Sequence, residues 1–351
     1  MKISDLTPAV EPIAWERGHL RLLDQRALPL SEKWLDIHEL GKLCEAIKSL
    51  AVRGAPLLGI TAAYGLVLGL SERREPEITR CYRDIRRQIA RTRPTARNLF
   101  DSLELADRIM GGGDIKNPEK AAAGLLELAR KIHDDERRNC HRIAEHGLAA
   151  FGEYRTVLTH CNTGVLATGG IGTALGVIHA AAKFGNLERV FADESRPLLQ
   201  GARLTAWELD RLGIPHFVIC DSAAAGLIRG GEVDAVITGA DRIAANGDTA
   251  NKVGTLGLAT SCAAAGVPFY IAAPTSTFDF SIAGGGEIEI EMRGEGEIRG
   301  WGDCRWTLPN TPALNPAFDV TPAESIRGII TEMGIIENPT AEAFTAGCGC
   351  Q

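Results

Sequence analysis

The sequence predicts an α/β protein, with a mostly helical N-terminal domain at residues 1–150 and a Rossmann-like α/β domain at residues 151–351. Three observations support this division. The chain has 351 residues, whereas an ordinary domain has about 100–200. Apolar residues recur at helical spacing over much of the first part. After Gly152, short apolar runs alternate with stretches long enough for a helix, which is the pattern of a parallel sheet.

The N-terminal domain is expected to begin with a short β segment in residues 19–30 and to continue as helices. Residues 54–70 form the longest apolar run, but 17 residues with four glycines are few for a membrane span. We therefore expect a helix buried in a water-soluble core. Pro94 is expected to open a further helix. Asn117 and Pro118 offer an N-cap and a first-turn proline for the next one.

The C-terminal domain is expected to contain five parallel strands joined by right-handed crossovers. The apolar runs that predict them are residues 156–159, 189–192, 216–220, 234–238 and 268–272. Residues 281–312 are rich in Gly, Glu and Pro and are expected to form an irregular excursion. The sequence Thr-Pro-Ala-Glu at 321–324 resembles a capping box, so a last helix is expected from there to about Gly334.

Composition and charge exclude several classes of protein. The net charge of −7 and the pI near 5.7 argue against a general nucleic-acid or acidic-membrane binder. The first residues contain acidic side chains and no apolar core, so they do not form a signal peptide. Nine cysteines without a repeated spacing are typical of reduced thiols, and a cytoplasmic protein is expected. Cys348 and Cys350 form a C-x-C pair, a weak signal for metal binding or oxidation.

Reactive and polar residues follow each predicted strand, and the carboxyl ends of parallel strands meet at one edge, where ligands bind. A catalyst needs several kinds of group to converge, so we interpret this edge as an active site. The residues concerned are His160, Cys161, Asn162 and Thr163; Asp193, Glu194, Ser195 and Arg196; Asp221 and Ser222; Asp241 and Arg242; and Pro274, Thr275 and Ser276.

Cys161 and Asp241 are the strongest catalytic candidates at this edge. Cys161 stands between a strand and a predicted helix, whose N-terminus would lower the thiol pKa. The neighbouring His160 is expected to lower it further. A small buried hydrophobe is the alternative role for this cysteine. Asp241 ends an apolar strand, where partial desolvation would suit its carboxyl group to acid–base chemistry. An N-cap, or an ion pair with Arg242, is its alternative role.

Several basic residues precede predicted helix starts and predict a phosphorylated ligand. Asn251 and Lys252 come before one such helix, and Arg53, Gly54 and Ala55 come before the apolar helix. Arg91, Arg93 and Arg97 precede or begin another. Any single arginine is more often a surface residue. Together they suggest one small phosphorylated molecule held between the two domains.

One glycine-rich segment of the sequence resembles a dinucleotide-binding motif but matches it only in part. Gly170, Gly172 and Gly176 are followed by Asp193 in a partly suitable pattern. However, the glycines start well after the strand, and their spacing is one residue longer than in the fingerprint. No nucleotide cofactor is expected, and a nucleotide-dependent reductase is a disfavoured alternative that saturable NAD(P)H binding would reveal.

Long blocks of this sequence resemble the methylthioribose-1-phosphate isomerases, whose superfamily includes the alpha, beta and delta subunits of translation initiation factor 2B. The blocks are THCNTGVLAT with GIGTALGVIHAA, ADESRPLLQGARLTAWEL, VITGADRIAANGDTANKVGT, FYIAAPTSTFD and NPAFDVTPAE, with RGAPLLGITAAYG and RPTARNLF in the first half. The resemblance covers roughly residues 11–337.

The resemblance implies an aldose–ketose isomerase of methionine salvage. By similarity, Asp241 is the proton donor, and Cys161 stabilises the transition state or moves a proton. The implied substrate contacts are Arg53, Gly54, Ala55, Arg93, Gln200, Asn251 and Lys252. The family also implies a homodimer and neither a metal nor a nucleotide cofactor.

Two departures from the family pattern keep related functions open. Ile171 stands where many relatives carry an aromatic residue, and residues 281–312 fit the family loosely. The substrate could therefore be another pentose 1-phosphate, such as 5-deoxyribose 1-phosphate or ribose 1,5-bisphosphate. A non-catalytic regulatory relative of the initiation-factor subunits is a further alternative, but such a protein has no need of Cys161 and Asp241.

Overall fold

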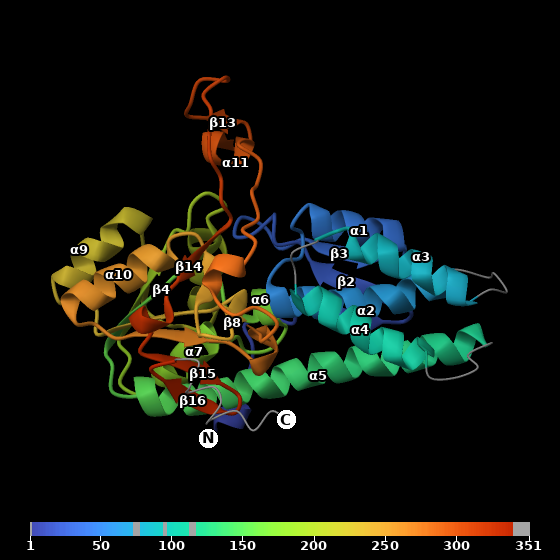
Figure 1. Cartoon of the computed structure of the whole chain (residues 1–351), viewed down its shortest axis with the longest axis horizontal. Coiled ribbons are helices and arrows are strands. Elements are labelled where there is room, and N and C mark those ends of the chain that lie inside the picture. Colours follow the sequence, from blue (N-terminus) through green and yellow to red (C-terminus); the bar gives the residue numbers. More distant parts are fainter. Residues whose placement is uncertain (1, 73–77, 94–96, 112–116, 340–351) are drawn as a thin grey trace. The chain divides into compact units, whose positions relative to one another are not determined.

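The computed structural model describes residues 2–72, 78–93, 97–111 and 117–339 and divides into two compact units (Figure 1). The helical unit contains residues 2–141 and 163–172, and the sheet unit contains residues 142–162 and those from 173 onward. Helix α5 (Pro118–Phe151) contributes to both. The predicted boundary at residue 150 therefore lies within a continuous helix.

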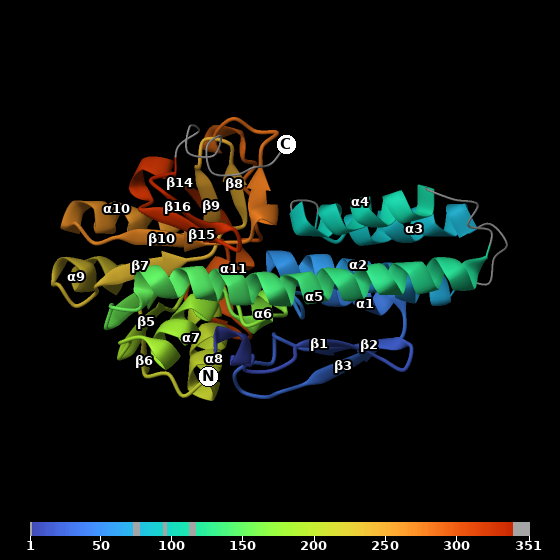
Figure 2. The same cartoon turned by 90° about the horizontal axis from the view of Figure 1, so that it is seen from below.

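The helical unit opens with a small antiparallel sheet, followed by helices. After a short 3₁₀ turn, η1 (Ile3–Asp5), the sheet has the order β1 (Ile13–Glu16), β2 (His19–Leu23) and β3 (Trp34–Ile37). Its buried side chains pack against α1 (Leu40–Lys48) and α2 (Ala55–Ser71), and Figure 2 shows the three strands side by side along these helices. The expected β start is confirmed, and it contains three strands.

Helix α2 is the apolar segment of the sequence, and fourteen of its residues are buried. Glycines permit this dense packing, because a Cβ on Gly65 would lie 2.7 Å from Leu43 and one on Gly69 2.7 Å from Ile85. Helices α3 (Ile78–Ala90), α4 (Arg97–Gly111) and α5 cover it. Among the described residues, no helix is long and apolar enough to cross a membrane.

The N-cap predicted for α5 is confirmed, since the Asn117 side chain accepts the N–H of Glu119 at 2.8 Å. The helix start predicted at Pro94 lies outside the described residues, as does the Cys348/Cys350 pair. The seven cysteines that the structure describes are all free thiols.

The sheet unit is built on seven strands in the order β16–β15–β10–β7–β4–β5–β6, parallel except for β16. The five predicted strands are confirmed. The strand bounds are β4 (Thr156–Thr159), β5 (Arg189–Asp193), β6 (His216–Ile219), β7 (Ala235–Thr238), β10 (Phe269–Ala272), β15 (Gly328–Thr331) and β16 (Gly334–Glu337).

Helices cover both faces of this sheet, as expected for right-handed crossovers. The end of α5, α7 (Ala174–Phe184) and α8 (Ala206–Arg211) pack on one face, and α9 (Ala224–Arg229) and α10 (Thr255–Ala265) on the other. Short turns of helix complete the connections: α6 (Val165–Thr168) in the helical unit, with η2 (Gly201–Thr205) and η3 (Asp221–Ala223) in the sheet unit. The Rossmann-like prediction is confirmed.

A second sheet beside these strands carries part of the site described below. It has the order β11 (Phe278–Asp279), β8 (Arg242–Ala244), β9 (Thr249–Lys252) and β14 (Phe318–Thr321). The helix predicted from Thr321 is wrong. Only a 3₁₀ turn, η6 (Ala323–Ser325), forms there, and β15 and β16 follow as a hairpin. The β-branched Ile329 and Ile330 of β15 are fully buried and pair with β10, while β16 pairs with β15. This tertiary pairing overrides the local capping signal.

The excursion predicted at residues 281–312 is confirmed as mostly irregular. It contains α11 (Gly296–Arg299) and a two-stranded ribbon of β12 (Gly300–Trp301) and β13 (Cys304–Arg305). Two 3₁₀ turns, η4 (Thr275–Thr277) and η5 (Gly285–Glu287), precede this ribbon. The ribbon projects from the sheet unit in Figure 1. Arg196 ties it to the loop after β5, because its guanidinium donates to the carbonyl of Ile298 at 3.0 Å and stacks on Trp306.

Candidate active site

The two strongest catalytic candidates follow neighbouring central strands of the main sheet. Strand β4 lies between β5 and β7, and the chain returns from β6 to β7 on the other side of β4. The carboxyl end of β4 is therefore the switch point at which parallel α/β sheets bind ligands. Cys161 comes just after β4, and Asp241 comes just after β7. The predicted convergence of these two residues at one sheet edge is thus a property of the strand order.

Cys161 is held in a strained backbone conformation by hydrogen bonds on each side. Its φ of 61° lies in the left-handed region, which costs a non-glycine residue about 1–2 kcal/mol. The Cys161 N–H donates to the hydroxyl of Ser195 at 2.7 Å, and its carbonyl accepts the hydroxyl of Thr205 at 2.6 Å. The side chain is half-buried. Strain of this kind, fixed by surrounding groups, clusters at functional sites.

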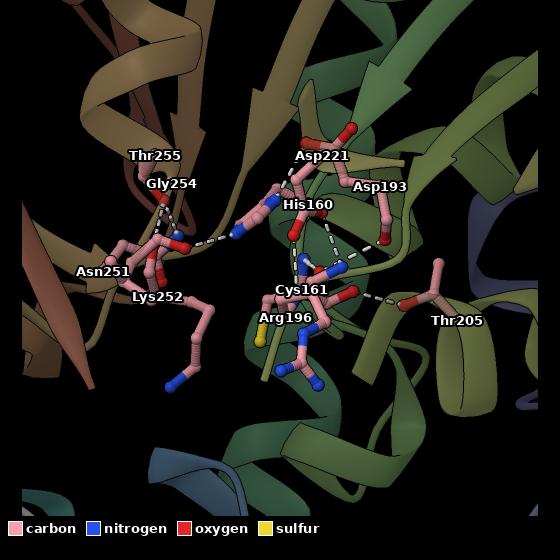
Figure 3. A network of polar contacts seen from close by, with 12 residues as sticks. His160, Cys161, Asp193, Arg196, Thr205, Asp221, Asn251, Lys252, Gly254 and Thr255 are labelled. Atoms are coloured by element: carbon pink, nitrogen blue, oxygen red, sulfur yellow. Dashed lines mark hydrogen bonds and ion pairs between the residues drawn. The ribbon is translucent and has the colours of Figure 1, made fainter. Parts of the chain in front are cut away.

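Ser195 is in turn held by Asp221. The N–H groups of Ser195 and Arg196 each donate to one carboxylate oxygen of Asp221, both at 2.7 Å. Ser195 also has a φ of 61° and is fully buried. Figure 3 shows this support reaching from Asp221 to the Cys161 backbone. The loops after β4, β5 and β6 therefore form one hydrogen-bonded assembly.

His160 does not support the thiol in the manner expected from the sequence. Its Nδ1 lies 2.9 Å from Asp193 Oδ2, and its Nε2 lies 3.0 Å from the carbonyl oxygen of Val253. Both ring nitrogens are therefore engaged away from the sulfur. The helix that was expected to lower the thiol pKa is also short, because α6 has only four residues.

Asp241 stands at the start of the β8–β9 hairpin, next to the predicted substrate contacts. Its N–H donates to the carbonyl of Ala250 at 2.9 Å, and Asn251 and Lys252 follow Ala250 directly. Asp241 is half-buried. The alternative partner Arg242 lies 3.7 Å from the carboxylate of Asp279.

Asn251 and Lys252 are buried and positioned by their neighbours. The Asn251 side chain donates to the hydroxyl of Thr255 at 3.0 Å. The Lys252 ammonium donates to the carbonyl of Ala317 at 2.8 Å and lies 4.6 Å above the ring centre of Phe318. In Figure 3, Lys252, Cys161 and the Arg196 guanidinium point to the same side of the network. This side of the edge can receive an anionic ligand.

The start of α10 is not open to an anion in the way the sequence suggested. The N–H groups of Gly254 and Leu256 donate to the two carboxylate oxygens of Asp319, at 2.7 and 3.2 Å. Burial raises the pKa of Asp319, against the lowering effect of these two N–H groups. An internal carboxylate thus occupies the cradle that a phosphate was expected to fill.

Gln200 follows the loop after β5 and carries an unusual buried oxygen. The side chain is 6% exposed, and its Oε1 has no hydrogen-bond partner among the described residues. A buried amide oxygen without a partner costs about 1–3 kcal/mol. A ligand that donates a hydrogen bond would remove this cost, which supports the predicted contact.

The other predicted contacts belong to the helical unit. Arg53 donates to the side chain of Gln25 at 3.1 Å, and Gln25 donates to the carbonyl of Leu166 at 2.7 Å. Gly54 begins α2 with a φ of 97°, and a Cβ there would lie 2.4 Å from the Cα of Ala167. Among the residues that the structure describes, no side chain caps α2, so its first N–H groups suit an anion.

The three arginines that were expected to contact a phosphorylated ligand differ in their surroundings. Arg97 forms an ion pair with Asp101 on its own helix at 2.8 Å, and Arg91 is exposed. Arg93 is half-buried and follows α3, directly before the undescribed residues 94–96. Its substrate contact stays a prediction.

His160, Asp193 and Asp221 lie close enough for their ligand atoms to be within 4.8 Å of one another. Hydrogen bonds account for His160, Asp221 and one oxygen of Asp193, whereas Asp193 Oδ1 is buried with no partner among the described residues. His160 uses both nitrogens, and Asp221 accepts two backbone N–H groups. We assign the cluster to loop support.

Comparisons with known proteins agree with this architecture. The chain matches the Initiation factor 2 subunit family over residues 51–338. It is 47% identical to the methylthioribose-1-phosphate isomerase of Thioalkalivibrio sulfidiphilus, with 99% of each chain covered. It is 45% identical to that of Heliobacterium modesticaldum, over 96% of this chain and 99% of the relative. The chain belongs to the methylthioribose-1-phosphate isomerase family.

Solved structures give the same result. A 5-methylthioribose 1-phosphate isomerase from Pyrococcus horikoshii OT3 aligns with a TM-score of 0.89 and 35% identity, covering 98% of this chain and 96% of that one. The translation initiation factor eIF-2B subunit delta from A. fulgidus aligns with a TM-score of 0.82 and 36% identity, covering 96% and 98%. The methylthioribose-1-phosphate isomerase family thus shares its fold with initiation-factor subunits.

Proposed function

We propose that this protein converts 5-methylthioribose 1-phosphate into 5-methylthioribulose 1-phosphate, as a step of methionine salvage. The observation that carries the proposal is the placement of Cys161 and Asp241 after the neighbouring strands β4 and β7, in a chain of this family. A thiol and a carboxyl group at a sheet switch point suit proton movement on a small bound sugar.

The reaction explains why an acid and a second reactive group are needed. The phosphate blocks the anomeric oxygen, so the ring cannot open as a free sugar does. An acid must protonate the ring oxygen, and we assign this role to Asp241. Hydrogen then moves from C2 to C1, so C2 is oxidised to the ketone while C1 is reduced. Cys161 stabilises the open form or carries the proton.

The substrate contacts follow from the chemistry of the remaining residues. Lys252 and Asn251 supply positive charge and an amide beside Asp241, and Gln200 supplies an unpaired buried acceptor. Arg53, Gly54 and Ala55 supply a guanidinium and open N–H groups at the start of α2. Arg93 is assigned to the same substrate. We further propose that the protein acts in the cytoplasm as a homodimer without a cofactor.

Proton NMR of the purified protein with 5-methylthioribose 1-phosphate in deuterated water tests the proposal, with Cys161→Ser as the control. Ketose should appear with the wild-type protein and not with the variant. Deuterium at C1 would indicate proton transfer with exchange against solvent, whereas hydride transfer, or return of the same proton in a closed site, would leave C1 without deuterium. Light scattering of the same sample tests the dimer.

A folded protein without turnover would contradict the proposal. The same assay with 5-deoxyribose 1-phosphate and ribose 1,5-bisphosphate then identifies a related isomerase. Failure with all three substrates would favour a regulatory relative, such as the initiation-factor subunit with the same fold.

A further inference from the structure

His160 and Asp193 form a buried pair directly behind the candidate site. Each residue is 1% exposed, and the atoms facing each other are His160 Nδ1 and Asp193 Oδ2, 2.9 Å apart. The pair joins three strands, because Asp193 ends β5, His160 follows β4, and the other ring nitrogen reaches Val253 after β9. Cys161 and Lys252 are the chain neighbours of His160 and Val253.

The partners of the imidazole ring determine how many protons the pair holds. The Val253 carbonyl can only accept a hydrogen bond, so His160 Nε2 must carry a proton. The contact between Nδ1 and the carboxyl oxygen also needs a proton, since two lone pairs would otherwise face each other. The pair therefore contains two protons and has no net charge, whichever partner holds the shared one.

The surroundings resist both gain and loss of the shared proton. Loss would leave a net negative charge in a buried site that Asp221, Glu194 and Asp319 also face. Gain would leave a net positive charge with little access to water. Burial raises the pKa of Asp193, against the hydrogen bond from His160. Lys252, from β9, is a basic group that acts on this cluster through Asp319.

We propose that His160 and Asp193 are a positioning pair that keeps one shared proton and fixes Cys161 and Lys252 relative to each other. The imidazole acts as a rigid bridge between the loop after β4 and the end of β9. Gly254 keeps the space for it, since a Cβ there would lie 3.0 Å from the ring. The pair supports catalysis through geometry and does not exchange its proton during turnover.

Two substitutions of Asp193 separate geometry from charge. The amide of Asp193→Asn can donate to Nδ1 while Nε2 still donates to Val253, so the bridge persists without the shared proton. Asp193→Ala removes the bridge. We expect kcat to fall about 100-fold in Asp193→Ala, the size typical of a displaced reacting group. In Asp193→Asn, kcat should fall less than about 10-fold. Asp210→Asn, at an exposed position on α8, is the matched control.

The shared proton gives a readout that needs no substrate. A proton NMR signal far downfield of the amide region should be present in the wild type and in Asp210→Asn and absent in both Asp193 variants. The measurement of kcat depends on the proposed isomerase activity, whereas the measurement of the proton signal does not.

Circular dichroism melts establish that each variant is folded before its kinetics are compared. The proposal is overturned if the downfield signal is missing from the wild type. It is also overturned if the signal and kcat are lost together as the pH is changed, which would make the pair an acid–base group. Equal loss of kcat in folded Asp193→Asn and Asp193→Ala would exclude a geometric role.

Discussion

The hydroxyl of Ser195 accepts the backbone N–H of Cys161 at 2.7 Å, and both residues have a φ of 61°. Two left-handed residues, one after β4 and one after β5, thus stabilise each other at the sheet edge. The geometry of Cys161 depends on a residue in a different loop. Substitutions at Ser195 should therefore change the site without touching the thiol.

Ser195→Ala removes the acceptor for the buried Cys161 N–H, and we expect the free energy of unfolding to fall by about 1–3 kcal/mol. Ser195→Gly also removes the hydroxyl but suits the positive φ, which offsets about 1 kcal/mol of that loss. Urea denaturation of the two variants measures the difference. Equal stability of the two variants would show that Ser195 is not strained.

Asp241→Asn keeps the shape of the side chain and removes its acid. Turnover should fall by at least about 100-fold if Asp241 protonates the ring oxygen. The free energy of unfolding should change by no more than about 0.5 kcal/mol. Steady-state kinetics and thermal melts measure the two effects, with the exposed Asp303→Asn as control. Activity close to that of the wild type would exclude Asp241 as the acid.

Gly54→Ala should be far more damaging than Gly18→Ala, although both glycines have positive φ angles, of 97° and 86°. A Cβ at Gly54 would lie 2.4 Å from the backbone of Ala167, whereas nothing lies within 4 Å at Gly18. We expect about 1 kcal/mol of destabilisation at Gly18 from φ alone. At Gly54 overpacking should add about 1–3 kcal/mol. Denaturant titration of both variants measures the free energy of unfolding. A similar loss of stability in the two would contradict the close approach of Gly54 to Ala167.

Gln200→Met replaces a buried amide by an apolar side chain of similar length. Because the Gln200 Oε1 has no partner among the described residues, the melting temperature should stay the same or rise. The KM for the sugar phosphate should rise about tenfold, the equivalent of one lost hydrogen bond. Lower stability with an unchanged KM would assign Gln200 a purely structural role.

Asp248 should make stability depend on acid pH. Burial alone would raise its pKa, but hydrogen bonds from Asn246, Ala323 and Gly285 outweigh it and hold the pKa below its ordinary value. A lowered pKa means that the stabilisation is present above about pH 4 and is lost as the pH falls through the folded-state pKa. Asp248→Asn should therefore be less stable than wild type at neutral pH, and the difference in the free energy of unfolding should shrink as the pH falls below about 4. Thermal melts across this range measure it, and a constant gap would contradict the assignment.

The five central strands could be predicted because each is a short apolar run buried on both faces, as in β4 and β7. The hairpin of β15 and β16 could not be predicted in this way. Its Thr-Pro-Ala-Glu start satisfies a local helix signal, while its pairing with β10 depends on residues far along the chain. The isoleucine pairs on each side of Glu332 and Met333 were the signal for strands.

Only part of the candidate site could be predicted from the sequence, because the contacts between its residues also depend on tertiary structure. Strand ends identified His160, Asp193, Ser195 and Asp221 as members of the edge, but not which of them touch. The role of Thr205 has no signal in the sequence, since its contact with Cys161 depends on the fold of η2. Asp319 likewise reaches the start of α10 across 65 residues.

The division of the chain constrains the order in which the protein folds during synthesis. Residues 163–172 complete the helical unit, yet they emerge from the ribosome after β4 of the sheet unit. Domains made first generally fold first, but here the first unit must wait for a segment made later. The sheet unit waits longer, because β15 and β16 complete its edge near the end of the chain. A stalled nascent chain that ends before residue 172 would contain neither unit in finished form.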